Sequence, residues 1–357
     1  MFAFRREKKI SDSDVIDIYK ILLDREPESE AVIDGYKAFG SWESIVRAIG
    51  NSEEFADRVR KSPFYYYHSC FDAVGTLRGH AVPSLEPREG YVTNYLGVLV
   101  DPKFQPNLLK EKAGQVESIP IPSNWHADIA EWAAALRAVD FARETFTMVE
   151  LGCGWGCWMN NTGMAAKRKG KKVHVIGVEG DVGHLAFARE SCAVNGFDAG
   201  EITLHHGIAA ATSGIALFPR QVAAGSDWGL QPIFNADDDE RMRARSSGRY
   251  EELPMIALDQ VIGDHDRLDL LHVDIQGGEA DLVDECLETL CGRVAYMVIG
   301  THSRQIEGRI MDTLLKAGWR LEIERPAILT LSDKGPDVVV DGVQGWRNPA
   351  LLPDAGR

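Results

Sequence analysis

From Trp125 onwards, short apolar segments alternate with amphipathic ones, and this alternation limits the possible folds more than any other feature of the chain. Apolar runs of about four to eight residues, each followed by a longer helical pattern, are typical of strands that alternate with helices. Strands joined in this way form a parallel sheet that is covered on both faces. We therefore predict an α/β fold with a doubly wound, mostly parallel sheet of seven strands.

The predicted elements of this region are separated by short polar connections. The strands cover residues 147–151, 172–178, 201–206, 268–273, 295–299, 319–324 and 337–340. The helices cover residues 127–143, 158–169, 182–195, 257–262, 279–290 and 304–317. A polar segment at residues 226–250 interrupts the series, and we predict a mobile insertion there.

The first part of the chain predicts a separate, small all-α domain over residues 8–62. An Asp/Ser-rich start at Ser11 can cap a helix whose apolar residues form a broad stripe up to Leu23. Shorter helical patterns follow at residues 31–36, 42–49 and 53–60.

Residues 63–124 predict a connector or lid rather than a domain. The segment begins with the aromatic stretch FYYYHSCF and then becomes rich in Pro and Gly, with one candidate strand at residues 97–100. Its aromatic side chains favour packing over the main domain, which we assign to residues 125–357. Such a long irregular connection is either an inert strap or a lid over a substrate, and both alternatives stay open.

Charge and hydropathy argue against several classes of protein. A formal net charge of −15 opposes nucleic-acid binding, which depends on clustered Lys and Arg. No apolar run reaches the roughly 20 residues of a membrane helix, and the first residues lack the apolar region of a signal peptide. We therefore expect a cytoplasmic protein with reduced thiols, in which Cys153 and Cys157 are packing residues without the further ligands that zinc needs.

The stretch MVELGCGWGCWMNN places Gly152, Gly154 and Gly156 directly after the first predicted strand of the sheet. Such a turn lets a ligand approach bare backbone, at the edge where open α/β sheets bind their ligands. The spacing differs from the G-x-G-x-x-G of dinucleotide sites, and Glu150 before it would repel a diphosphate. A cationic ligand fits better, and S-adenosylmethionine carries both an ammonium and a sulfonium group.

The ends of the next two strands predict contacts with a nucleoside. Glu179 ends the strand in VIGVEGD, about 25 residues after the glycines, where a carboxylate can accept both hydroxyls of a ribose. Gly207 and Ile208 follow the third strand and are candidates for the wall and backbone contact of an adenine ring, although such a pair is often plain turn and core.

Two later strand ends deliver groups suited to proton transfer. Asp274 ends the strand LDLLHVD, Glu279 opens the following helix, and His302 follows the strand AYMVIG. We favour a metal-free site in which His302 removes a hydroxyl proton and Asp274 orients it or the substrate. Alternatively, Asp274 and His302, with Glu279 or a water, hold a divalent cation that binds a diol.

Purely structural roles are open for the same residues. The two acids can cap a helix N-terminus, and His302 can be a polar turn residue. His272 alternates with apolar neighbours, so we predict a packed core histidine. Trp125 and His126 could close over the cofactor, although a core position suits a tryptophan better.

With these motifs in place, the chain resembles the FkbM-type methyltransferases of the class I S-adenosylmethionine-dependent fold. The resemblance covers residues 120–345 and rests on VELGCGWG, VIGVEGD, LDQVIG, LDLLHVDIQGGEADLV and IGTHS, of which DIQGGE is the specific block. Family members commonly have Lys before the aspartate strand, where this chain has His272, and Glu or Gln after it, where it has Gln276. The resemblance implies a Rossmann-like sheet and methylation of hydroxyls on sugars, polyketides and other secondary metabolites.

Residues 11–60, with IYKILLDREPES and GNSEEFADR, are similar to a small helical domain of unknown function found in many bacterial proteins, some of them linked to glycans and cell surfaces. Together with the first resemblance, this makes a sugar of a surface glycan the first expectation for the methyl acceptor.

The sequence therefore predicts an S-adenosylmethionine-dependent O-methyltransferase acting on a small molecule or glycan. Two alternatives remain: an NAD(P)-dependent oxidoreductase, and a non-catalytic glycan-associated protein on a methyltransferase scaffold. The sequence leaves homo-oligomer formation open.

Overall fold

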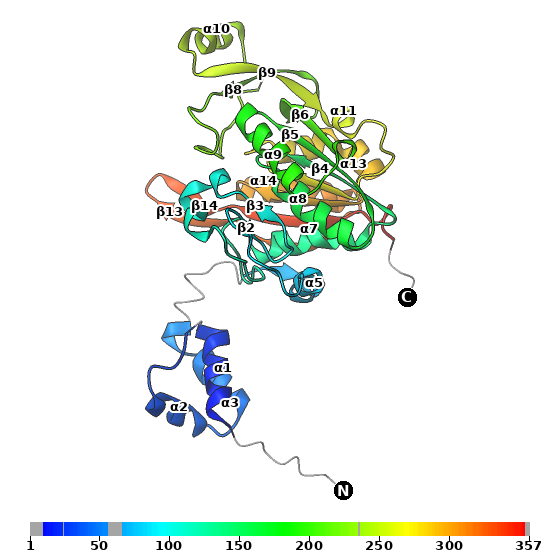
Figure 1. Cartoon of the computed structure of the whole chain (residues 1–357). Helices are drawn as coiled ribbons and strands as arrows, with labels where there is room; N and C mark the ends of the chain where they lie inside the picture. The colour runs from blue at the N-terminus through cyan, green and yellow to red at the C-terminus, as the bar shows by residue number, and fades with distance from the viewer. Residues whose placement is uncertain (1–9, 24, 56–65, 235, 354–357) are drawn as a thin grey trace. The chain divides into compact units, whose positions relative to one another are not determined.

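The computed structural model describes residues 10–23, 25–55, 66–234 and 236–353 (Figure 1). It divides into two compact units, residues 1–66 and residues 67–357, and each is described by itself. No helix among the described residues has the length and apolar character needed to cross a bilayer.

The first unit is a small helical domain with its own core. It contains α1 (Asp12–Leu23), α2 (Glu30–Lys37) and α3 (Trp42–Gly50). The side chains of Ser29 and Ser41 accept backbone hydrogen bonds at the starts of α2 and α3, as helix caps do. Its buried apolar residues are Ile10, Val15, Ile18, Tyr19, Leu23, Ile45 and Ile49. Most of the helix predicted at residues 53–60 lies outside the described residues.

The second unit is built on an eight-stranded sheet with the order β1-β12-β15-β11-β10-β4-β5-β6. The strands are β1 (His68–Ser69), β4 (Thr145–Leu151), β5 (Lys172–Glu179), β6 (Ile202–His206), β10 (Leu270–Val273), β11 (Tyr296–Thr301), β12 (Arg320–Arg325) and β15 (Gly342–Arg347). Strands β11, β10, β4, β5 and β6 pair in parallel, whereas β15 is antiparallel to both β11 and β12. The predicted α/β fold with a mostly parallel sheet is confirmed.

Alternate residues of the strands face two separate cores, so the sheet is covered on both faces. One core holds the helices α7 (Ile129–Phe141), α8 (Cys157–Arg168) and α9 (Val182–Val194). The other holds α11 (Leu258–Ile262), α12 (Glu279–Glu285), α13 (Leu287–Arg293) and α14 (Arg304–Lys316). Met148 and Val149 of β4 show the alternation, since they belong to different cores.

The last strands of the chain differ from the predicted ones. The sheet has eight strands rather than seven, because it contains six of the predicted strands together with β1 and β15, which were not predicted. The strand predicted at residues 337–340 belongs to β14 (Gly335–Val340), which pairs with β13 (Ile328–Ser332) outside the main sheet. The run of valines there favours a strand but is largely exposed, whereas every residue of β15 is buried.

Residues 67–124 pack against the core on the α7 side. This segment forms α5 (Ala73–His80), β2 (Val92–Thr93), β3 (Leu99–Val100), α6 (Pro106–Leu109) and the 3-10 turns η2 (Pro102–Phe104) and η3 (Lys110–Lys112). Its side chains Leu77, Leu96 and Phe104 are fully buried in that core.

The polar segment at residues 226–250 is more ordered than predicted. It holds α10 (Asp238–Ser247), and it follows β7 (Ile208–Ala210) and β8 (Gly214–Pro219), which form a second, three-stranded sheet with β9 (Tyr250–Ala257). In Figure 1, β8, β9 and α10 extend beyond the β6 edge of the main sheet.

Gly342→Ala tests the buried position of β15. A Cβ at this position would lie 2.0 Å from Glu307 Oε1 and 2.2 Å from Thr301 Oγ1, two atoms that share a hydrogen bond. We expect the variant to lose about 1–3 kcal/mol in the free energy of unfolding, measured by urea denaturation, because overpacking displaces these groups.

Gly308→Ala is the matched control, because Gly308 lies inside α14 and no atom is within 4 Å of the added methyl. This substitution is expected to raise the free energy of unfolding by up to about 1 kcal/mol. If the two variants were equally stable, the tight packing around β15 would be wrong.

Candidate functional site

The residues singled out in the sequence follow the carboxyl ends of neighbouring strands. Glu150, Glu179, Asp274 and His302 lie in or after β4, β5, β10 and β11, which all run in the same direction. Parallel strands place their carboxyl ends along one edge of the sheet, the edge at which this class of fold binds ligands.

The glycine turn after β4 depends on its three glycines. Gly152, Gly154 and Gly156 have φ values of +77°, +52° and +77°, in the region that side chains rarely adopt. A Cβ on Gly152 would lie 2.1 Å from the carbonyl oxygen of Asp274. The turn is therefore in direct backbone contact with the end of β10, and it begins α8 at Gly156.

Glu150 supports this turn from inside the protein. Its side chain is 3% exposed, and its two oxygens accept hydrogen bonds from the backbone of Trp158 (3.2 Å) and Met159 (2.9 Å) in the first turn of α8. Burial raises the pKa of Glu150 to about 7. The contact of Glu150 with a cationic ligand stays a prediction.

Glu179 links the ends of β4 and β5. Its Oε2 atom accepts a hydrogen bond from Gly154 N (2.8 Å), and its Oε1 atom accepts one from Asp181 N (2.7 Å). The Nδ1 atom of His184 lies 3.8 Å from the same Oε1 atom. The carboxylate thus lies beside the glycine turn, as expected, with one backbone donor on each oxygen.

Gly207 and Ile208 lie where β6 gives way to β7. The Gly207 amide donates to the carbonyl of Glu179 (3.0 Å), and a Cβ on Gly207 would lie 2.6 Å from the carbonyl oxygen of Pro254. Ile208 is buried with apolar residues of the second sheet. These contacts explain both residues structurally, so the adenine contact stays a prediction.

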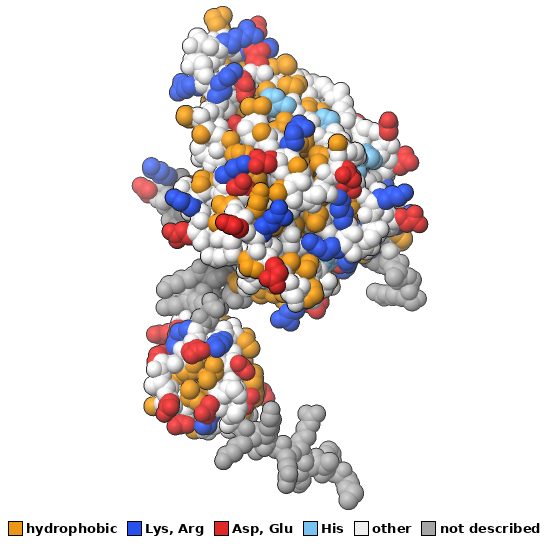
Figure 2. Space-filling model, viewed as in Figure 1, with side chains coloured by type: hydrophobic (Ala, Val, Ile, Leu, Met, Phe, Trp, Pro, Cys, Tyr) orange, Lys and Arg blue, Asp and Glu red, His pale blue; other side chains and the backbone are white. Residues whose placement is uncertain are grey.

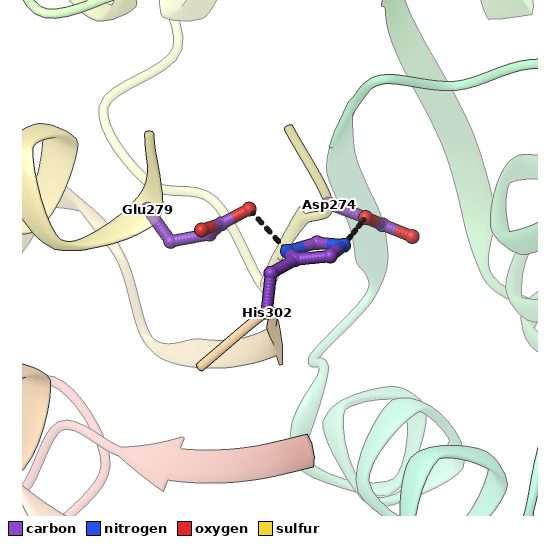
Figure 3. Close-up of side chains that lie close together, drawn as sticks. All are labelled: Asp274, Glu279 and His302. Atoms are coloured by element: carbon purple, nitrogen blue, oxygen red, sulfur yellow. Dashed lines mark ion pairs between the residues drawn. The ribbon is translucent and has the colours of Figure 1, made fainter. Parts of the chain in front are cut away.

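Asp274, Glu279 and His302 come together as one group (Figure 3). His302 Nε2 lies 3.3 Å from Asp274 Oδ1, and His302 Nδ1 lies 2.9 Å from Glu279 Oε1 without hydrogen-bond alignment. The Glu279 side chain is fully buried and also accepts the amides of Ile275 and Gly277, whereas the Asp274 side chain is 44% exposed. Asp274 is therefore the accessible acid of the group.

Gly300 lies beside the Asp274 carboxylate. A Cβ there would lie 3.5 Å from the carboxyl carbon of Asp274. This distance is an ordinary van der Waals contact, so Gly300, near the end of β11 and two residues before His302, places the backbone of that strand against Asp274.

Charge in this group favours a protonated histidine. Burial lowers the pKa of His302, but the two carboxylates outweigh it and raise the pKa to about 10. Desolvation raises the pKa of Asp274, and the opposing effect of His302 leaves it below its usual range. At neutral pH the group is an imidazolium between two carboxylates, and His302 must lose its proton before it can act as a base.

A divalent cation is the other possibility for these residues. One ligand atom from each of the three lies within 4.8 Å of the others. However, the two carboxylates approach opposite nitrogens of the imidazole, as Figure 3 shows, so a cation bound at one nitrogen would require a carboxylate to move. The metal-free base and the cation therefore both remain alternatives for this group.

His272 is buried in β10, below the carboxyl ends of the strands that carry the site. Its Nε2 atom lies 3.0 Å from Glu131 Oε1, its ring stacks on Trp158 at 5.2 Å, and its Nδ1 atom has no partner among the described residues. Burial lowers its pKa, but Glu131 outweighs burial and the pKa is raised. Glu131 was not predicted, and its position two residues inside α7 gave no signal in the sequence.

An aromatic cluster covers the glycine turn on the α7 side. Trp155 stacks on Phe104 at 5.6 Å and on Trp125 at 6.2 Å, and His126 lies 5.8 Å from the rings of both Trp155 and Trp158. Burial lowers the pKa of His126 to about 4. Residues 102–126 therefore supply one wall beside the turn.

The thiols of the turn are structural. Cys153 and Cys157 are buried and unpaired, and burial raises the pKa of both well above the ordinary value. A thiol in this state is a poor nucleophile.

Comparison with known proteins identifies a relative. The chain is 46% identical over 263 residues to a protein from Jannaschia sp. (strain CCS1) described as "Putative methyltransferase", and the match covers 73% of this chain and 94% of the relative. No family model matches the chain.

Solved structures with a similar fold have low sequence identity. The structure of methyltransferase FkbM from Methylobacillus flagellatus KT is 13% identical, with a TM-score of 0.36, and the match covers 61% of this chain and 54% of that one. A structure described as "a putative RNA methyltransferase" from Pyrococcus horikoshii is 10% identical, with a TM-score of 0.34 and coverage of 64% and 88%. At these TM-scores neither structure says anything about the acceptor.

Stability at high pH tests the protonation of His302. A pKa raised from 6.5 to about 10 in the folded protein contributes stability that is complete below pH 6.5 and is lost as pH rises through 10. We expect the wild-type melting temperature to fall by several degrees more over this range than that of His302→Gln, measured by calorimetry.

Other groups that titrate near pH 10 are present in both proteins, so the difference between the two curves isolates His302. Parallel curves would mean that the carboxylates do not hold the imidazole in its charged form.

Proposed function

The chain belongs to the methyltransferase family of its Jannaschia relative, and from this we propose that it transfers a methyl group from S-adenosylmethionine to a hydroxyl group of its acceptor. The observation that carries the proposal is the convergence at one sheet edge of a glycine turn, the Glu179 carboxylate and the Asp274–His302 pair. Family membership favours methyl transfer over the nicotinamide oxidoreductase, whereas the non-catalytic scaffold is separated from it by the turnover assay described below.

The residues at this edge fit S-adenosylmethionine. Buried Glu150 has a pKa of about 7, so a nearby ammonium or sulfonium would stabilise its charged form. We propose that Glu150, Gly152, Gly154 and Gly156 hold the methionine part, and that Glu179 holds the ribose. Gly207 and Ile208 are proposed to face the adenine. When bound, the cofactor supplies an electrophilic methyl group on sulfur.

Asp274 and His302 are proposed to handle the proton of the acceptor hydroxyl. Glu279 lies at Nδ1 of His302, which leaves Nε2 as the nitrogen that faces accessible Asp274. Once the 3.3 Å contact between His302 Nε2 and Asp274 Oδ1 opens, a hydroxyl that enters between them can pass its proton to neutral His302 while Asp274 orients it, the arrangement that general-base catalysis requires. Methyl transfer needs little more than this proton removal and in-line placement.

The acceptor is proposed to be a sugar of a glycan or a secondary metabolite. This proposal rests on the resemblance to FkbM-type enzymes and on the net charge of −15, which opposes polyanionic acceptors. On the face in Figure 2, Lys and Arg side chains of the second unit are interspersed with Asp and Glu. RNA is the control acceptor that tests this choice.

The cofactor assignment is tested by calorimetry with S-adenosylhomocysteine. We expect the wild type to bind it and Glu179→Ala to bind at least about tenfold more weakly, because the ribose hydroxyls lose their acceptor. Glu179→Gln keeps an acceptor oxygen for only one of the two backbone amides, so we expect it to weaken binding as well, but by less than Glu179→Ala.

Glu288→Ala is the matched control, because Glu288 lies on α13 and is exposed. Wild-type affinity in Glu179→Ala would exclude the nucleoside assignment, and absence of binding by the wild type would exclude the cofactor.

The base assignment is tested by the transfer of radioactive methyl groups to a panel of methyl glycosides, with total RNA in parallel. Because His302 has a pKa of about 10, we expect kcat/KM to rise about tenfold per pH unit from pH 7 to 9. His302→Ala should keep its affinity for S-adenosylhomocysteine and lose at least about 100-fold in kcat.

Full turnover in His302→Ala would remove the base from the proposal. Turnover that a chelator abolishes and Mg²⁺ restores would replace the metal-free site with the cation alternative. Methylation of RNA but not of glycosides would overturn the acceptor class.

A further inference from the structure

Residues 221–229, here called the crossing segment, lie across three of the strand ends that form the site. At the β5 end, a Cβ on Gly183 would lie 2.6 Å from Ala224. At the β4 end, a Cβ on Gly154 would lie 3.0 Å from Trp228. Towards β10, a Cβ on Gly229 would lie 3.9 Å from Gln276 Oε1, beside Asp274.

His184 fixes this segment at its β5 end. Its Nε2 atom accepts a hydrogen bond from Gly225 N (3.2 Å) and lies 3.1 Å from the side-chain amide of Gln221. The Oε1 atom of Gln221 in turn accepts from Ser226 Oγ and Asp227 N. Because Nε2 is an acceptor, the ring proton of His184 is on Nδ1, the nitrogen near Glu179.

Trp228 brings a large aromatic ring to the glycine turn. Its indole stacks on the His184 ring with a centroid distance of 3.9 Å and an interplanar angle of 2°. Its Cζ3 and Cε3 atoms are the atoms nearest to the missing Cβ of Gly154. The residue is only half-buried, so part of the indole stays accessible beside Gly154, whose amide binds Glu179.

The indole also carries an unused hydrogen-bond donor. The Nε1 atom of Trp228 is buried and has no acceptor among the described residues. A buried indole N–H usually has a partner, and because this one is shielded from solvent, an acceptor on a ligand reaches it only if the indole shifts on binding.

We propose that Trp228 is a binding residue for the nucleoside of the cofactor, supplied by the crossing segment, with its indole against the purine or ribose held at Gly154 and Glu179. The inference rests on the proposed function, since it takes S-adenosylmethionine as the ligand. It makes residues 226–229, the start of the polar segment at residues 226–250, part of the cofactor site rather than of the acceptor site.

The Trp228 indole has the chemistry that recognition of a nucleoside requires. Every purine presents a π-face to an aromatic ring, and stacking of a base on an aromatic side chain contributes about 1–3 kcal/mol by alanine substitution. The His184–Trp228 stack holds the indole in one orientation, so less side-chain entropy is lost when the ligand binds.

Titration calorimetry with S-adenosylhomocysteine and with 5′-methylthioadenosine tests the proposal. Trp228→Ala is expected to weaken both ligands by the same factor, about 5- to 100-fold, because both contain the nucleoside. Trp228→Phe, which keeps an aromatic face and loses the N–H, should lose less than Trp228→Ala. Trp42→Ala, a half-exposed tryptophan of the first unit, is the matched control and should bind both ligands as the wild type does.

Tryptophan fluorescence gives a second measurement that does not depend on the alanine variant. Saturating S-adenosylhomocysteine should change the emission of the wild type, and Trp228→Phe should lose most of that change. The inference is overturned if Trp228→Ala binds as tightly as the wild type or more tightly, if only S-adenosylhomocysteine is weakened, or if Trp228→Phe keeps the full emission change.

Failure of the proposed function has a different signature. A wild type that binds neither ligand would remove the cofactor itself, and the role of Trp228 with it. Wild-type binding that is intact in Trp228→Ala but weak in Glu179→Ala would remove Trp228 alone.

Discussion

The contact between Gly152 and the carbonyl of Asp274 is the constraint on which the site depends. With a Cβ position only 2.1 Å from that oxygen, no side chain fits between the ends of β4 and β10. The contact fixes the glycine turn next to the loop that carries Asp274. Next to this contact, the Gly154 amide donates a hydrogen bond to Glu179. The Asp274 carboxylate, which lies beside Gly300, contacts the His302 ring. Backbone packing thus determines which charged groups meet.

The acids of the site have two different roles, structural support and chemistry. Glu150 and Glu279 are buried and accept backbone amides, so their main observed contacts stabilise a helix start and a loop. Asp274 keeps an accessible carboxylate, and His302 supplies positive charge between two acids. The two carboxylates that stabilise the imidazolium also raise the pKa of His302. Because His302 must be neutral to act as a base, the proposed activity increases with pH.

Sequence periodicity predicted the parallel part of the fold because those strands are continuous apolar runs between helical patterns. It failed where local pattern and burial disagree. The valines of β14 have strand propensity but little burial, whereas GVQGWR in β15 has two glycines and a glutamine yet is completely buried. The predicted helix at residues 279–290 divides at Cys286 into α12 and α13, and no glycine or proline marks the division.

For the site, the sequence could place residues at strand ends but could not give their partners. The proximity of Asp274 and His302 was predictable, since adjacent parallel strands end at one edge. The sequence grouped Glu279 with Asp274 and His302, but the position of Glu279 at His302 Nδ1 and the stacking of Trp228 on His184 depend on loop paths that have no periodic pattern. One aromatic wall of the turn comes from residues 102–126 and the other from residues 221–229. Irregular segments far apart in the chain therefore enclose the turn that the regular elements position, and the specificity of such a fold can change without a change in its sheet.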